Sequence, residues 1–283
     1  MTTARLQRYE RDGLVFDVRD AGPARGQSVV LLHGFPETSA SWQSVTPGLA
    51  EAGYRVLAPD QRGYSPGARP RPRRAYRREE LVADVVALAD AAMLDRFHLV
   101  GHDWGAAVAW QVAMQHPGRL RSLTALSVAH PAAFRRAALT SRQGLRSWYM
   151  GFFQLPLLPE AMLRSGAWQT MRRNLRRSGL PAAFADEYVE HLRSPGALTA
   201  ALNWYRGLRP LSDSRAVAVR VPTLMVWGDR DAYCDRRGVT LTERYVTASY
   251  RLEVFEGAGH WIPEEAPERL LSVLLLHLRR NRA

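Results

Sequence analysis

Short runs of apolar and β-branched residues alternate along this chain with stretches of helical periodicity, and this alternation limits the possible folds more than any other feature of the sequence. Strands that alternate with helices form parallel βαβ units, whose helices pack on both faces of the sheet. The sequence therefore predicts an α/β fold with a mostly parallel sheet flanked by helices. We expect strands at 28–32, 54–58, 97–100, 120–128, 221–227 and 250–255, and helices at 77–95, 104–115 and 267–280.

One long segment interrupts this alternation. From about 131 to 211 the strand signal is replaced by helical stretches that contain Arg and Trp and are separated by prolines. We expect this segment to be a helical cap inserted into a core made of residues 1–130 and 212–283. A chain of 283 residues, of which 46% are hydrophobic, is long enough to bury a large core beneath such an insertion.

The net charge of +12 comes from arginine, because the chain has no lysine. A clustered basic face would indicate nucleic-acid binding. The densest basic run, Arg69–Arg78, is broken by prolines and lies where a loop is expected. We interpret it as a solvated loop and expect no nucleic-acid partner.

The chain carries no pattern typical of a metal centre, a disulfide or a membrane span. Cys234 is its single cysteine and no CxxC or HExxH spacing occurs, so we predict no metal and no cofactor. The first residues are polar, and no stretch approaches the roughly 20 uninterrupted apolar residues of a transmembrane helix. We therefore expect no secretory signal, no membrane association and a cytoplasmic location.

A Gly-x-Asp-x-Gly motif lies between an expected strand and an expected helix, at 101–105. Hydrolases with this layout carry a serine nucleophile in Gly-x-Ser-x-Gly, on a tight turn that the glycines permit. Asp103 takes that place here. Aspartate is also a preferred N-cap residue, so the alternative is that Asp103 only caps the following helix. Capping would not explain the acid and the histidine found further along the chain, and we predict that Asp103 is a nucleophile.

A carboxylate nucleophile restricts the reactions that are accessible. It is already anionic at neutral pH and displaces a leaving group at a saturated carbon without first losing a proton. Epoxides and alkyl halides meet this requirement. The product is an ester of Asp103, whose hydrolysis needs a base and an oxyanion hole.

The expected base is a histidine close to the C-terminus. The segment EGAGHWIPE (256–264) follows the last expected strand and places His260 on a loop, where this layout supplies its general base. The alternative is a surface loop histidine. An acid should hold the imidazole in the required tautomer. Of the two acids in VWGDRDAY (226–233), we predict Asp231 for this role and interpret Asp229 as a turn residue.

The oxyanion hole of this layout uses the backbone N–H after the nucleophile and another from the loop after an earlier strand. Trp104 supplies the first, and Phe35 in His33-Gly34-Phe35-Pro36 supplies the second. Gly34 lets the backbone approach closely and Pro36 stiffens the loop, and we hypothesise a cis Phe35–Pro36 peptide. Trp104 and Phe35 can at the same time be apolar lining.

Five motifs resemble, in the same order, those of the α/β-hydrolase-fold epoxide hydrolases, an aspartate-nucleophile branch related to the haloalkane dehalogenases. The resemblance spans nearly the whole chain. It implies the α/β-hydrolase fold and a two-step reaction that converts an epoxide to a vicinal diol through a covalent aspartyl ester. The loop GYSPGARP lacks the Gly-Tyr-Gly-x-Ser form common in relatives, which we expect to affect the edge of the site. The motifs are HGFPE (33–37), DQRGYSPGARP (60–70), GHDWGA (101–106), LNWYRG (202–207) and GHWIPEE (259–265).

The resemblance also implies that two cap tyrosines donate hydrogen bonds to the epoxide oxygen. Tyr205 in LNWYRG matches the second of these tyrosines, and Tyr149 in SWYMGFFQLP resembles the first. A phenol is a reasonable acid for the alkoxide that ring opening creates. The alternative for each is a core aromatic residue with a satisfied hydroxyl. By the same resemblance, Glu37 and His102 support the hydrolytic water.

Other functions stay open at this point. A haloalkane dehalogenase shares the aspartate nucleophile and the tryptophan after it, but those enzymes usually carry Asn or another halide-binding group where this chain has Phe35, and they lack the paired tyrosines. An esterase fits less well. The fold can also serve as a non-catalytic ligand-binding scaffold. The presence of Asp103, Asp231 and His260 together argues against that last alternative.

The expected cap is rich in aromatic residues. We therefore expect a small-molecule apolar or aryl epoxide as substrate, with water as the second reactant, and we leave a homodimer open. The aromatic residues are Trp148, Phe152, Phe153, Trp168 and Trp204.

Overall fold

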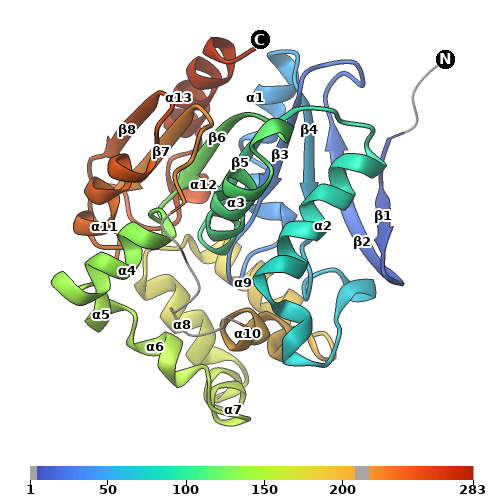
Figure 1. Cartoon of the computed structure of the whole chain (residues 1–283). Coiled ribbons are helices and arrows are strands. Elements are labelled where there is room, and N and C mark those ends of the chain that lie inside the picture. The colour runs from blue at the N-terminus through green and yellow to red at the C-terminus, as the bar shows by residue number, and fades with distance from the viewer. Residues whose placement is uncertain (1–4, 208–216, 283) are drawn as a thin grey trace.

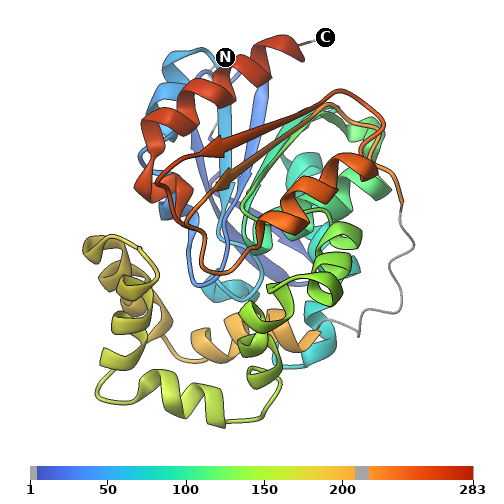
Figure 2. The same cartoon turned by 90° about the vertical axis from the view of Figure 1, so that its left-hand side faces the viewer.

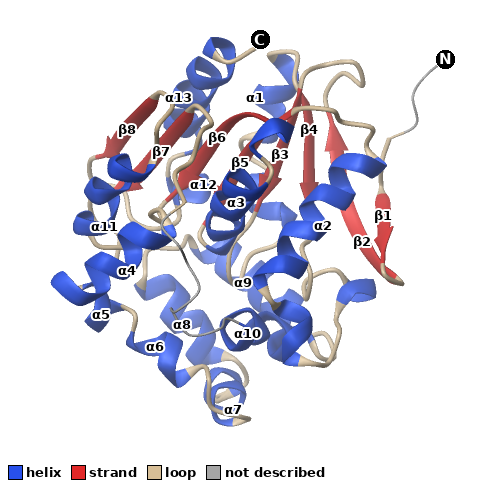
Figure 3. Cartoon of the chain, viewed as in Figure 1, coloured by secondary structure: helices blue, strands red, loops and turns tan. Residues whose placement is uncertain are grey.

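An eight-stranded sheet forms the centre of the part of the chain that the structure describes (Figures 1 and 3). The structure is a computed structural model that describes residues 5–207 and 217–282. The strand order is β1-β2-β4-β3-β5-β6-β7-β8. The strands are β1 (Arg8–Arg11), β2 (Leu14–Ala21), β3 (Ser28–Leu32), β4 (Arg55–Pro59), β5 (Phe97–His102), β6 (Leu120–Leu126), β7 (Thr223–Gly228) and β8 (Tyr250–Phe255).

Strands β3 to β8 are all parallel, which confirms the predicted α/β class with a mostly parallel sheet. Each predicted strand is present within two residues of its predicted bounds. Because parallel strands all end at the same edge of the sheet, the loops that follow them gather there. Proteins with open α/β sheets bind their ligands at this edge.

The sequence did not predict β1 and β2, which form an antiparallel hairpin that continues onto β4. Asp12 and Gly13 join the two strands with φ values of 51° and 74°. Two residues with positive φ are typical of a tight hairpin turn, and an Asp-Gly step is its strongest short-range signal. The hairpin was therefore visible in the sequence at this step.

Helices cover both faces of the sheet. Helices α2 and α3 pack in one layer, whereas α1 and α13 pack in the other. Successive residues of β3 alternate between the layers, because side chains along a strand point to opposite faces: Val30 and Leu32 join the first, Val29 and Leu31 the second. The helices of this core are α1 (Thr46–Glu51), α2 (Arg78–Ala91), α3 (Trp104–Gln115), α11 (Arg236–Leu241), α12 (Ile262–Glu265) and α13 (Pro267–Arg280).

Between β6 and residue 207 the chain is helical and contains no strand. We call residues 131–207 the helical segment, and Figure 2 shows its helices gathered at one end of the sheet. The predicted end of the insertion, at 211, lies outside the described residues. None of the helices in the described ranges is long and apolar enough to cross a lipid bilayer. The helices are α4 (Pro131–Thr140), α5 (Gln143–Arg146), α6 (Trp148–Phe152), α7 (Leu158–Arg164), α8 (Gln169–Arg177), α9 (Ala182–Leu192) and α10 (Ala197–Gly207).

Buried polar contacts hold the helical segment together and tie it to the core. Arg206 of α10 forms a two-pronged ion pair with Glu160 of α7, with N–O distances of 2.6 and 2.9 Å. Arg206 also donates to the backbone oxygen of Phe153. The hydroxyl of Tyr188 in α9 donates to the Glu264 carboxyl of α12 over 2.7 Å. Breaking such buried contacts leaves polar groups without partners, so they fix where the segment lies.

Candidate active site

Asp103 lies on a tight turn between β5 and α3. Its backbone has φ 48° and ψ −118°, which is strained for a residue other than glycine. A Cβ on Gly101 would overlap the backbone of Gly105, and a Cβ on Gly105 would overlap the backbone of Leu32, so the turn needs both glycines. Trp104 begins α3, and its N–H belongs to the first helical turn, where backbone donors lack partners within the helix.

The carboxylate of Asp103 points away from the helix that follows it. No side-chain hydrogen bond from Asp103 caps α3, which contradicts the interpretation of this residue as a helix cap. Instead, Oδ1 accepts the backbone N–H of Phe35 over 2.9 Å, and Oδ2 lies 3.4 Å from Nε2 of His260. The structure therefore brings together the predicted nucleophile, an oxyanion-hole donor and the base.

His260 lies on the loop between β8 and α12, with its ring between two acids. Nδ1 of His260 is 2.9 Å from Oδ2 of Asp231, and the other oxygen of Asp231 accepts the backbone N–H groups of Tyr233 and Cys234. Asp229 bonds to the backbone N–H of a neighbouring loop at the surface. The contact with His260 thus belongs to Asp231, and Asp229 is the turn residue.

Both ring nitrogens of His260 face carboxylates. An ionised carboxylate only accepts hydrogen bonds, so both contacts form when the imidazole carries two protons. Burial alone would lower the pKa of His260, but the charge of Asp231 and the hydrogen bonds to Asp103 and Asp231 raise it well above its ordinary value. For Asp103, burial works against ionisation, yet the contact with His260 lowers its pKa. The resting site therefore holds an imidazolium between two carboxylates.

The loop after β3 presents the Phe35 N–H to the nucleophile. A Cβ on Gly34 would overlap the side chain of Asp103, so glycine is required for this close approach. The Phe35–Pro36 peptide is cis, as hypothesised. His33 bonds through Nδ1 to the backbone oxygen of Gly34 and so supports this loop from behind.

A buried pair of polar side chains lies next to the His260 loop. Oε1 of Glu37 and Nδ1 of His102 are 2.7 Å apart, and both side chains are fully buried. Nε2 of His102 is 2.9 Å from the backbone oxygen of His260. That oxygen is an acceptor, so Nε2 is the nitrogen that donates in this contact. His102 thus links Glu37 to the backbone of the His260 loop.

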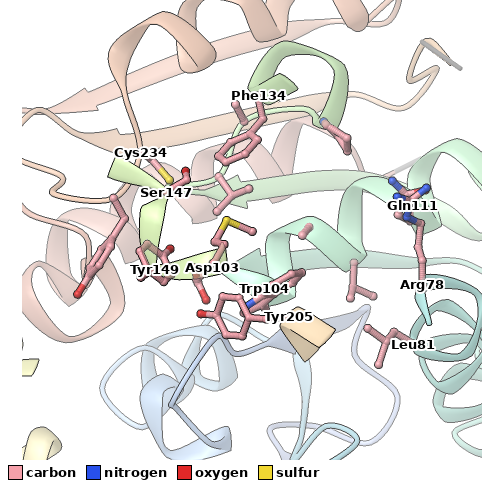
Figure 4. Close-up of a pocket in the computed structure, with 17 residues that line it drawn as sticks. Arg78, Leu81, Asp103, Trp104, Gln111, Phe134, Ser147, Tyr149, Tyr205 and Cys234 are labelled. Atoms are coloured by element: carbon pink, nitrogen blue, oxygen red, sulfur yellow. The ribbon is translucent and has the colours of Figure 1, made fainter. Parts of the chain in front are cut away.

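Tyr149 of α6 and Tyr205 of α10 reach the site from the helical segment. Their ring centroids are 6.0 Å apart, and Tyr205 also packs edge-on against Trp104 at 4.9 Å and Phe35 at 5.4 Å. Figure 4 shows both tyrosines beside Asp103. Burial is the main cause that raises the pKa of both phenols well above the ordinary value, and the charge of Asp103 adds to it. Both phenols consequently keep their protons in neutral solution.

Two cavities meet at the nucleophile. Asp103, Tyr149, Tyr205 and Tyr233 line both. One cavity, of about 180 Å³, follows α3 and is shown in Figure 4, whereas the other, of about 280 Å³, extends into the helical segment. Of the five aromatic residues that made the expected cap rich in aromatic side chains, Trp148, Phe152 and Phe153 line the second cavity, and Trp168 and Trp204 line neither cavity.

Sequence reasoning missed two residues that lie close to His260. The ring of Tyr233 is 4.9 Å from that of His260 and 5.7 Å from that of Tyr149. Its only sequence signal is its position two residues after Asp231. Glu264 is buried, and one of its oxygens has no hydrogen-bond partner among the described residues. Burial, together with the charge of Glu37, raises its pKa well above the ordinary value.

Asp231, Cys234 and His260 form a group of potential metal ligands among the described residues. Asp231 and His260 already bond to each other. Burial raises the pKa of the Cys234 thiol well above its ordinary value, which disfavours the thiolate that binds metals. The group is a poor ligand set, and the absence of a metal stays a prediction.

Comparisons with known proteins agree with this geometry. A family profile described as the alpha/beta hydrolase fold matches residues 27–267. The AB hydrolase superfamily protein YfhM of Bacillus subtilis (strain 168) is 38% identical over 99% of both chains. Epoxide hydrolase A of Mycobacterium tuberculosis (strain H37Rv) is 32% identical over 94% of both chains.

A solved structure supports the same assignment. The crystal structure of epoxide hydrolase A from Mycobacterium thermoresistibile is 28% identical and superposes with a TM-score of 0.83, covering 96% of this chain and 97% of its own. The sheet order, the aspartate between β5 and α3 and these relatives lead to one conclusion: the chain belongs to the α/β-hydrolase fold family, in the branch that includes the epoxide hydrolases.

Proposed function

We propose that this protein is an epoxide hydrolase, which converts an apolar epoxide to a vicinal diol through an ester on Asp103. One observation carries the proposal: the Asp103 carboxylate lies between a backbone N–H and the ring of His260, beside the buried phenol of Tyr205 and the partly buried phenol of Tyr149. A carboxylate explains attack on a saturated carbon, and the phenols explain how the ring oxygen is released. The relatives named as epoxide hydrolases support the same reaction.

In the first step the ionised Asp103 attacks a ring carbon. The C–O bond of the epoxide breaks, and its electron pair stays on the oxygen, which becomes an alkoxide unless it receives a proton. Tyr149 or Tyr205 donates that proton, since burial keeps both phenols protonated. The new bond is an ester between Asp103 and the former epoxide carbon.

The same step converts His260 into a base. Esterification removes the negative charge of Asp103, which is one of the two anions that raise the pKa of His260. The pKa of the imidazole therefore falls, and the ring releases a proton. The phenolate left by ring opening takes up the proton that the imidazole releases. The phenol is thereby restored, and the net result is the transfer of one proton from His260 to the new hydroxyl of the substrate. Neutral His260, held by Asp231, then takes a proton from the attacking water.

Water attacks the carbonyl carbon of the Asp103 ester in the second step. The negative charge that develops on the carbonyl oxygen is stabilised by the N–H groups of Phe35 and Trp104. Glu37 and His102 lie beside the His260 loop and hold the water in this proposal. The bond between the carbonyl carbon and the substrate oxygen then breaks, and the leaving oxygen takes up the remaining proton of the water. The diol leaves, with Asp103 ionised and His260 protonated again.

We further propose that the helical segment acts as a cap over the active site. It supplies the two phenols and the second cavity, whereas the core supplies Asp103, Asp231 and His260. A homodimer and the absence of a nucleic-acid partner stay predictions. Dehalogenation is the second candidate, but no contact of Phe35 or of the phenols favours it.

The test is to trap the ester. His260→Gln removes the base for the second step and leaves Asp103 able to attack, so we expect an adduct to accumulate with a reactive epoxide. An epoxide adds its whole mass because the ring oxygen is retained, whereas a haloalkane adds only its alkyl group. Intact-protein mass spectrometry with peptide mapping reads the mass and locates it.

The control is the double variant Asp103→Asn, His260→Gln, which should form no adduct. An acyl group on a serine would indicate an esterase instead. If wild-type protein turns an epoxide over while His260→Gln gives no adduct on Asp103 with that epoxide, the aspartyl-ester mechanism is wrong.

A further inference from the structure

The cavity that follows α3 is an apolar arm that begins at the nucleophile. Four of its lining residues lie on one face of α3, because they are spaced three or four residues apart. They are Trp104, Ala107, Val108 and Gln111. With a rise of about 1.5 Å per residue, the seven steps from Trp104 to Gln111 carry this arm roughly 10 Å away from the site.

The far end of this arm is polar. Arg78 and Gln111 both line the cavity, and in the view of Figure 4 they lie at the opposite end of the pocket from Cys234. Arg78 is half-buried at the start of α2, and no carboxylate of the described residues forms an ion pair with it. Gln115 donates to the amide oxygen of Gln111, which leaves the amide nitrogen available as a donor. Both side chains thus offer hydrogen-bond donors to the end of the cavity.

The chain segment that leads to Arg78 is also rich in positive charge. Seven arginines and no acidic residue occur between Asp60 and Glu79. This stretch includes the basic run Arg69–Arg78, which leads directly to the end of the arm. Clustered charge of one sign attracts ligands of the opposite sign. The cavity on the other side of the nucleophile differs, since its charged lining residues are Asp103 and His260 of the site itself.

We propose that Arg78 and Gln111 bind an anionic end group of the substrate. The substrate is then an epoxide with two arms: an apolar arm in the helical segment, and an arm of roughly 10 Å along α3 that ends in a carboxylate or similar anion. A guanidinium suits this role because its planar N–H groups match a carboxylate. This proposal rests on the proposed epoxide hydrolase function. It assigns the orientation in which the substrate lies in the active site.

The experiment compares epoxides that carry a carboxylic acid end group with the methyl esters of the same compounds as substrates. Disubstituted epoxides with one alkyl arm and one ω-carboxyalkyl arm of increasing length are assayed with wild-type protein, Arg78→Gln and Arg77→Gln. Arg77 is exposed, carries the same charge, and does not line the cavity. We expect wild-type protein to have a KM for the acid of matching length on the order of tenfold below that for its ester, as for one charge-assisted contact.

Arg78→Gln should abolish this preference by raising KM for the acid to that for the ester, and Arg77→Gln should retain it. Equal KM values for acid and ester in wild-type protein, or the same loss in both variants, would overturn the proposal. Binding of a saturated carboxylic acid of matching length, measured by calorimetry with wild-type protein and Arg78→Gln, gives the same comparison without turnover. Failure to hydrolyse any epoxide, esters included, would instead contradict the proposed function.

Discussion

In the proposed reaction, two phenols and one carboxylate act directly on the epoxide. If Tyr149 and Tyr205 together release the ring oxygen, changing either to Phe removes one donor and leaves the other. We expect each change to slow ring opening on the order of 10²-fold, the usual scale of general-acid catalysis, and the double change nearly to abolish it. Pre-steady-state measurement of ester formation reads this step directly.

The control for these variants is Tyr250→Phe. Tyr250 begins β8, and its buried hydroxyl has no partner among the described residues, so its loss should leave ring opening unchanged. A wild-type rate of ring opening in the Tyr149→Phe, Tyr205→Phe double variant would refute the acid role of the phenols. It would favour a dehalogenase instead, because dehalogenation requires no phenol.

Asp103 contributes, after the charge of Asp231, to the raised pKa of His260. Asp103→Asn removes the same charge that ester formation removes, and we expect the pKa of His260 to fall in this variant. Titration of the His260 ring followed by NMR compares the variant with wild-type protein. A pKa that does not move would mean that ester formation does not switch the imidazole to its basic form.

The same shift has a consequence for stability. A raised pKa in the folded state means that protonated His260 stabilises the fold fully below its ordinary pKa of about 6.5. That contribution disappears as the pH rises through the raised value. In Asp103→Asn it should disappear at a lower pH, which thermal unfolding across a pH series would detect.

Local motifs predicted the residues that meet in the reacting centre, because turns and strand ends leave signals in neighbouring residues. Asp103, Asp231 and His260 each follow a strand that the sequence predicted. Tyr233 and Glu264 have no such signal. Their positions depend on ring packing and on contacts with the helical segment, and these link residues far apart in the chain.

At the scale of elements, the parallel strands were predicted, whereas the first hairpin was missed although its Asp12-Gly13 turn signal is present in the sequence. β2 contains the acids Asp17 and Asp20, which make the run look polar. The side chain of Asp20 is nevertheless buried, because Arg55 of β4 pairs with it at 2.8 Å. Burial alone would raise the pKa of Asp20, but its hydrogen bond with Arg55 lowers it. This pairing depends on the fold and leaves no trace in the local pattern.

The hydrogen bond from Tyr188 of α9 to Glu264 of α12 helps to hold the helical segment on the core. Tyr188→Phe removes the donor to Glu264 and leaves a buried carboxyl oxygen without its partner. We expect a loss of about 1–3 kcal/mol in the free energy of unfolding, the cost of an unsatisfied buried group. Urea denaturation measures this loss.

The matched variant is Tyr76→Phe. Its hydroxyl is buried and has no partner among the described residues, so removing it should leave stability unchanged or slightly higher. Equal losses in the two variants would show that the Tyr188 hydroxyl does not hold the segment.

At the scale of the whole molecule, the position of His260, the proposed base, depends on the edge strand of the sheet. β8 is the last strand in the order, pairs on one side only, and leads into the His260 loop. Edges open at lower free energy than central strands. We expect activity to be lost at a lower urea concentration than the far-ultraviolet circular dichroism signal, which reports all the helices. Coincident midpoints would mean that the edge and the centre unfold together.

The strained backbone of Asp103 has a consequence for protein engineering. Positive φ at a residue other than glycine costs on the order of 1–3 kcal/mol, and here the cost falls on the nucleophile itself. Selection for thermal stability alone would therefore favour glycine at position 103. The same substitution would remove the proposed nucleophile and with it the activity. Screens for stable variants of this protein therefore need to measure activity as well as melting temperature, and to keep Asp103 unchanged.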